Sequence, residues 1–148
     1  MTVTALLQRE IDSDLPLTID IDSFRRVTAG LTRCTVEAVA ARSNDPAGRA
    51  ERLRRVARAI HANMELWAVV LHEVLDTANK LSPTQRTHIV ELAEVSIRHG
   101  SLVLQEEAAV DPLLVLNRSV IERLQRAGDR QAAAVEPVRS ALAIIGDR

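Results

Sequence analysis

Four histidines are the side chains in this sequence best suited to binding a metal ion. His61 and His72 are eleven residues apart, and so are His88 and His99. On a helix each pair would share one face, but a rise of ~1.5 Å per residue separates the two rings too widely for one ion. No acid stands three residues before any of the four, so the Glu-x-x-His pattern of di-iron helical bundles is missing. We therefore expect no metal site.

Nucleophilic catalysis has no better candidate. Cys34 lies on an apolar helical stripe, which favours a small, buried structural role for the thiol. No serine stands in a Gly-x-Ser-x-Gly turn, and the five glycines are too scattered to form a phosphate-binding loop. We expect no catalytic residue, no cofactor and no enzymatic activity.

A cluster of arginines is the third chemical feature, and it consists of Arg49, Arg52, Arg54, Arg55 and Arg58. Such a cluster can bind RNA phosphates or an acidic protein surface. It contains no aromatic residue on which RNA bases could stack. Glu51 precedes Arg54 and Arg55 by three and four residues, a spacing that allows ion pairing along a helix. We interpret the cluster as a solvated helix face, with a protein-binding or an RNA-binding patch as the alternatives.

The composition suits one soluble domain. The chain has 148 residues, of which 47% are apolar, with one Phe, one Trp and no Tyr, so aliphatic side chains must build the core. The net charge of −1 indicates neither a nucleic-acid nor a membrane partner. The sequence shows no signal-peptide pattern and no apolar run long enough for a membrane span. We expect a cytoplasmic protein.

Apolar residues recur at helical spacing over most of the chain, which predicts an all-α fold. We expect a compact bundle of four main helices and a short fifth helix, over residues 22–41, 47–78, from 82–84 to beyond 100, 112–127 and 135–145. Gly100 could end or kink the third helix, and Gly128-Asp129 could stop the fourth. The predicted organisation is a partly extended N-terminal arm at 1–22, a helical domain at 23–127 and a C-terminal helical extension at 128–148.

Asn117 is set into the apolar face of the fourth expected helix, one turn from Leu113 and from Ile121. A buried Asn must find hydrogen-bond partners or cost roughly 1–3 kcal/mol. We therefore expect Asn117 to fix how this helix meets its neighbour or to meet a partner chain. Trp67, where two apolar stripes of the second helix meet, is either a core residue or part of a groove for a partner helix.

Five short motifs occur in an order that resembles the FlaF family of flagellar biosynthesis regulators. They are Asn63-Met64-Glu65-Leu66-Trp67, Asn79-Lys80-Leu81-Ser82-Pro83, the helix pattern Arg86, Ile89, Leu92, Val95, Arg98-His99, then Pro112-Leu113-Leu114 and Leu116-Asn117-Arg118-Ser119-Val120-Ile121. The similarity is continuous from about residue 59 to 124 and looser over 23–58. The two ends of the chain have no counterpart in it.

The resemblance implies a helical, non-enzymatic regulator of flagellin synthesis that acts as a secretion chaperone. Its implied partner is flagellin, bound by an amphipathic segment in an apolar groove, with a functional link to the translational regulator FlbT. The partner-binding residues that the motifs suggest are Asn63, Leu66, Trp67, Arg98, His99, Asn117 and Arg118. The alternative function is an RNA-binding regulator of flagellin messenger that uses the Arg49–Arg58 face. A third interpretation is a structural module that self-associates through residues 135–145.

Overall fold

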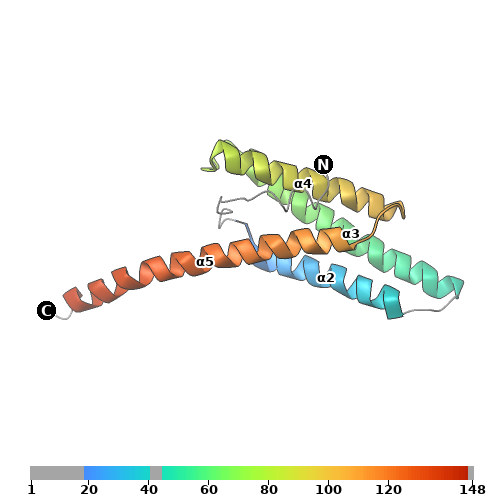
Figure 1. Ribbon diagram of the computed structural model, residues 1–148, viewed down its shortest axis with the longest axis horizontal. Helices are drawn as coiled ribbons and strands as arrows, with labels where there is room; N and C mark the ends of the chain where they lie inside the picture. Colours follow the sequence, from blue (N-terminus) through green and yellow to red (C-terminus); the bar gives the residue numbers. More distant parts are fainter. Residues whose placement is uncertain (1–18, 41–44, 147–148) are drawn as a thin grey trace.

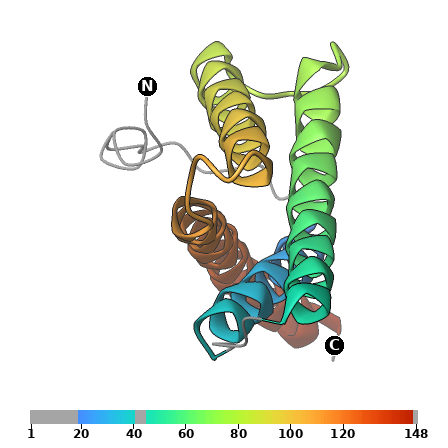
Figure 2. The same ribbon diagram turned by 90° about the vertical axis from the view of Figure 1, so that its right-hand side faces the viewer.

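Four helices make up the regular structure of the computed structural model, which describes residues 19–40 and 45–146. They are α2 (Ile21–Ala40), α3 (Pro46–Leu75), α4 (Pro83–Leu104) and α5 (Asp111–Gly146) (Figure 1). α3 and α4 form an antiparallel pair, and α2 packs against both α3 and α5 (Figure 2). The all-α prediction is thus confirmed for the described part of the chain. The predicted N-terminal arm lies mostly outside the described residues, and the division at residues 22 and 127 stays a prediction.

Side-chain caps begin the first three of these helices. Asp45 accepts a hydrogen bond from the Gly48 backbone N–H at 3.1 Å and starts α3. At α4, Ser82 and Gln85 form a reciprocal capping box, with bonds of 3.2 and 3.0 Å. Both helices place a proline in the first turn, where its missing N–H costs nothing.

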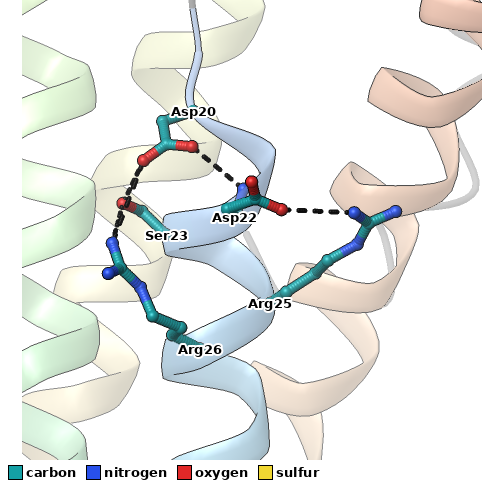
Figure 3. A network of polar contacts seen from close by, with 5 residues as sticks. All are labelled: Asp20, Asp22, Ser23, Arg25 and Arg26. Atoms are coloured by element: carbon teal, nitrogen blue, oxygen red, sulfur yellow. Dashed lines mark hydrogen bonds and ion pairs between the residues drawn. The ribbon is translucent and has the colours of Figure 1, made fainter.

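The start of α2 differs slightly from the predicted start at residue 22. The Asp20 carboxylate accepts from the Asp22 backbone N–H at 3.0 Å and from the Ser23 hydroxyl (Figure 3). The cap therefore lies two residues earlier. The Ser23 hydroxyl is the main reason that the pKa of Asp20 lies below its ordinary value of 3.8, because it stabilises the ionised carboxylate.

Gly100 does not end or kink α4, which continues to Leu104. A Cβ on Gly100 would lie 2.9 Å from Met64 Cγ and 3.4 Å from Ile60 Cγ2, both on α3. The missing side chain therefore allows α3 and α4 to approach closely. α4 ends in a Schellman motif instead, with Glu106 at a φ of 60° and bonds from Glu106 N to Val103 O (3.0 Å) and Glu107 N to Leu102 O (2.9 Å).

α5 runs unbroken from Asp111 to Gly146, so the prediction of a stop at Gly128-Asp129 and of a separate fifth helix at 135–145 is wrong. A glycine ends a helix when it adopts a left-handed conformation, and no described glycine has a positive φ. Pro137 also lies within the helix rather than before a new one. The C-terminal half of α5 extends beyond the other three helices (Figure 1), and residues 129–136 are all exposed.

Two apolar clusters form the core. The larger one gathers side chains from all four helices around Trp67 and includes Phe24, Val70, Leu92, Leu116 and Val120. The smaller one contains Leu31, Ile60, Val103, Leu113 and Leu114. The rings of Phe24 and Trp67 meet edge to face, with centroids 5.2 Å apart and an interplanar angle of 85°. The sole Phe and the sole Trp of the chain are thus both used to join α2 to α3.

Candidate functional site

A chain of buried polar side chains joins two of the motifs singled out in the sequence, Asn63–Trp67 and Leu116–Ile121. The Trp67 indole donates to Asn117 Oδ1 at 3.0 Å, and Asn117 Nδ2 donates to Asn63 Oδ1 at 2.7 Å. Asn63 Nδ2 in turn donates to the Ser96 hydroxyl at 3.2 Å. All four residues are at most 1% exposed. The prediction that Asn117 fixes how its helix meets a neighbour is confirmed, because this network joins α3, α4 and α5.

Burial gives Asn63, Trp67 and Asn117 a structural role within the chain, so any effect of theirs on a partner would be indirect. Leu66, beside Trp67, is half-buried and packs against the larger core cluster. Ser96 completes the network but belongs to none of the sequence motifs. Ser96 lies one turn before His99 on α4, within an apolar stripe. This position in the sequence is the signal that marks it as a buried polar group.

His99 holds the loop between α4 and α5 through a hydrogen bond to its backbone. Its Nε2 lies 2.8 Å from the Ala109 carbonyl oxygen, which can only accept, so Nε2 carries the proton. This contact gives His99 a structural role toward the neighbouring backbone. Arg98 and Arg118 are both exposed, and neither side chain forms an ion pair or hydrogen bond with another described residue. Of the seven candidate partner-binding residues, these two arginines offer the most accessible polar groups.

Arg86 has a role that the sequence alone did not reveal. Its guanidinium donates to the carbonyl oxygens of Val74 and, at 3.4 and 3.1 Å, of Asp76 and Asn79. The last turn of a helix leaves carbonyl groups without partners, and a cation is favoured there. Arg86 therefore closes the C-terminus of α3, which ends at Leu75, three residues before the predicted Ala78.

The arginine cluster of α3 is partly neutralised by one acid. Glu51 pairs with Arg54 at 2.7 Å, with Arg55 at 3.4 Å and with Arg58 at 3.5 Å. Arg49 lies 4.0 Å from Glu106. The predicted pairing of Glu51 is confirmed. Because all these arginine side chains are at least half exposed, each ion pair contributes little to stability.

A solvent-open groove of about 430 Å³ lies between α2 and α3. Its lining consists of Arg26, Val27, Gly30, Arg33, Cys34, Arg55, Arg58, Ala59 and Ala62. Two members of the arginine cluster, Arg55 and Arg58, therefore line the same groove as Arg26 and Arg33 of α2. Cys34 is half-buried rather than fully buried, and its thiol lies 3.6 Å from the Arg55 carbonyl oxygen. A sequence signal for this site was the Arg26–Gly30–Arg33 spacing, which places all three on one side of a helix.

The described residues include no group of three or more His, Cys, Asp or Glu side chains that could hold a metal ion. In the same part of the chain, no helix has both the length and the apolar character needed to cross a membrane. The polar network and the groove remain as the two features that distinguish this helical body.

Comparison with known proteins gives one match. The family model described as "Flagellar protein FlaF" matches residues 16–124, which is most of the chain and begins earlier than the similarity traced from the motifs. Searches of curated proteins and of solved structures find no match. The matched segment holds the whole polar network and the groove, whereas the far half of α5 lies outside it. The chain belongs to the FlaF family of flagellar proteins.

Proposed function

We propose that this protein is a non-enzymatic regulator of flagellin synthesis that binds newly made flagellin and holds it ready for export. The observation that carries the proposal is the match of the FlaF family model over residues 16–124. Capture of flagellin would couple its export to its translation, through the regulator FlbT. The site of action would be the cytoplasm.

The proposed mode of binding is an amphipathic segment of flagellin laid against the helical body. Association of this kind uses apolar residues recurring along one face of the incoming helix. An open groove between α2 and α3 supports this mode, and so do the exposed guanidinium groups of Arg98 and Arg118. Shielding the apolar face of flagellin would keep it from aggregating before export.

Co-purification with the host's flagellin tests the proposal, followed by calorimetric titration at two salt concentrations. A stoichiometric complex that persists at the higher salt is expected, because apolar burial is screened far less than exposed charge pairs. Absence of a complex would overturn the proposal. Salt-sensitive binding of flagellin messenger in its place would favour the Arg49–Arg58 face as an RNA-binding surface.

Arg118→Ala and Arg98→Ala are the informative variants at the candidate residues, because both side chains are exposed. Each should weaken flagellin binding without changing the melting temperature. Arg126→Ala, an exposed arginine farther along α5, is the matched control. Asn117→Ala is unsuitable for this purpose, because its side chain is fully buried and its loss would disturb the core.

A further inference from the structure

We propose that the groove between α2 and α3 docks an amphipathic helix of a protein partner that carries carboxylates along both edges of its apolar stripe. The inference rests on the proposed function in one respect, since it names the site where a flagellin segment would be held. It is carried by the composition of the groove, which combines an apolar floor with two basic rims.

The floor of the groove is made of small side chains. Gly30 and Val27 come from α2, and Ala59 and Ala62 come from α3. A Cβ built on Gly30 would meet no atom within 4 Å, so the space above it is open. Leu31 and Ile60, both fully buried, belong to the same core cluster and hold the two helices together. The groove thus has a fixed base and room for apolar side chains from outside.

Two arginines stand on each rim, Arg26 and Arg33 on α2 and Arg55 and Arg58 on α3. Arg26 leaves α2 on the side opposite to Arg25 (Figure 3). Arg33 is exposed, and its side chain makes no ion pair or hydrogen bond with another described residue. Guanidinium groups bind carboxylates in a planar, paired geometry, so a row of acids on each edge of an incoming helix would match the two rims.

The existing partners of these arginines leave them able to bind such acids. Arg26 lies 4.0 Å from Asp20, and Arg58 lies 3.5 Å from Glu51. The side chains of these pairs are 40–77% exposed. Exposed ion pairs contribute little, so exchanging them for a partner's carboxylates has a small cost. Asp20 and Glu51 together bring two negative charges to the four arginines that line the groove.

A protein helix fits the groove better than RNA does. Single-stranded RNA is usually held by stacking its bases on aromatic side chains. The chain has no Tyr, and its single Phe and single Trp, Phe24 and Trp67, are both at most 1% exposed. Neither can reach a base. The apolar floor also offers RNA nothing, whereas it can receive the apolar stripe of a helix.

The test uses the full chain and a fluorescent synthetic helix of about 18 residues, or five turns, with Leu and Ala on one face and Glu at both edges. A second peptide carries Lys in place of every Glu. Fluorescence anisotropy should show binding of the Glu peptide, and binding of the Lys peptide should be at least about tenfold weaker because like charges meet at the rims. Equal binding of the two peptides, or binding of neither, would overturn the proposal.

Two substitutions and their matched controls assign the binding to the groove. Arg33→Glu should weaken the Glu peptide at least about fivefold through charge repulsion, while Lys80→Glu, an equal charge change in the α3–α4 loop, should not. Gly30→Trp should block the floor. Gly128→Trp places the same side chain in open space on α5 and should leave the affinity unchanged. Peptide binding that neither Arg33→Glu nor Gly30→Trp reduces would contradict the assignment.

Cys34, the single cysteine of the chain, supplies an independent readout because it lines the groove. Saturating Glu peptide should slow its reaction with a maleimide at least about fivefold, in proportion to the occupied fraction. An unchanged rate at saturation would place the peptide elsewhere.

Flagellin itself separates this inference from the proposed function. Flagellin bound equally by the wild type, Arg33→Glu and Gly30→Trp would overturn the groove assignment and leave the chaperone proposal standing. Failure to bind flagellin, together with groove-dependent binding of the Glu peptide, would overturn the chaperone proposal and leave the groove assignment standing. Binding of single-stranded RNA that Arg33→Glu abolishes, without binding of the Glu peptide, would overturn the groove's assignment to a protein helix.

Discussion

The indole N–H of Trp67 on α3 donates to the side-chain oxygen of Asn117 on α5 at 3.0 Å, across 50 residues of sequence. Asn117 Nδ2 donates to Asn63 Oδ1 at 2.7 Å, so the Asn117 amide satisfies two buried groups of α3. Each of these groups would be unpaired if α5 were displaced by one turn. The network therefore selects one register of α5 against α3, in addition to the apolar contacts around it.

Asn117→Leu should lower the free energy of unfolding by about 2–4 kcal/mol, because it leaves both the Trp67 N–H and the Asn63 oxygen without a partner. Urea denaturation followed by circular dichroism measures the change. Val115→Leu on the exposed face of α5 is the control and should change stability by less than ~0.5 kcal/mol. A loss no larger than in the control would show that the network adds nothing to stability.

Arg86→Met should destabilise the protein by about 1–3 kcal/mol, because the carbonyl groups at the end of α3 lose their charged donor. Arg86→Lys should recover only part of this, since a single ammonium group cannot span the carbonyls that the guanidinium reaches. Thermal melting of the wild type, Arg86→Met and Arg86→Lys gives their order of stability. Full recovery with lysine would indicate that charge alone matters there.

Glu106→Gly should stabilise the protein by about 1 kcal/mol. Glu106 holds a φ of 60° in the Schellman motif after α4, a conformation that costs a residue with a Cβ roughly 1–2 kcal/mol and costs glycine much less. The lost contact with Arg49 is exposed and 4.0 Å long, so it offsets little of this gain. Arg49→Ala measures that contact separately. A destabilised Glu106→Gly protein would mean that the ion pair outweighs the backbone strain.

Asp20→Asn should change how stability depends on pH in acid. The folded-state pKa of Asp20 lies below 3.8, so ionised Asp20 stabilises the fold above that pH, and this contribution is lost as the pH falls through the folded-state pKa. The stability difference between wild type and variant should be constant near neutrality and shrink below pH 3.8. Ser23→Ala, which removes the main donor to the carboxylate, should produce the same trend. Stability curves of wild type and variant that stay parallel below pH 3.8 would contradict this expectation.

The sequence predicts the elements of this fold better than the points where they meet. Helical spacing locates all four helix starts within about two residues, the usual uncertainty of a helix boundary. The burial of Asn117 also follows from its place in an apolar stripe. Its partner Trp67 does not, because the relative placement of α3 and α5 depends on how both helices pack against α2 and α4.

Glycines show the same limit. Gly100 and Gly128 are both predicted to interrupt or end a helix, yet both are helical. Gly100 faces Met64 and Ile60 at close range, whereas Gly128 has no atom within 4 Å of a built Cβ. The sequence around each glycine does not show this difference in their surroundings. The groove is hidden from sequence reasoning in the same way, since Arg33 and Arg58 become neighbours of one site only when α2 packs on α3.

The long reach of α5 makes one continuous helix behave as two regions in hydrogen exchange. Amides in its first half are protected by the core, where Leu113, Leu116 and Val120 are buried. Residues 129–136 have exposed side chains throughout, so only the helix's own hydrogen bonds protect their amides. These amides should exchange through local fraying, at rates that do not follow global unfolding, unless a binding partner covers them.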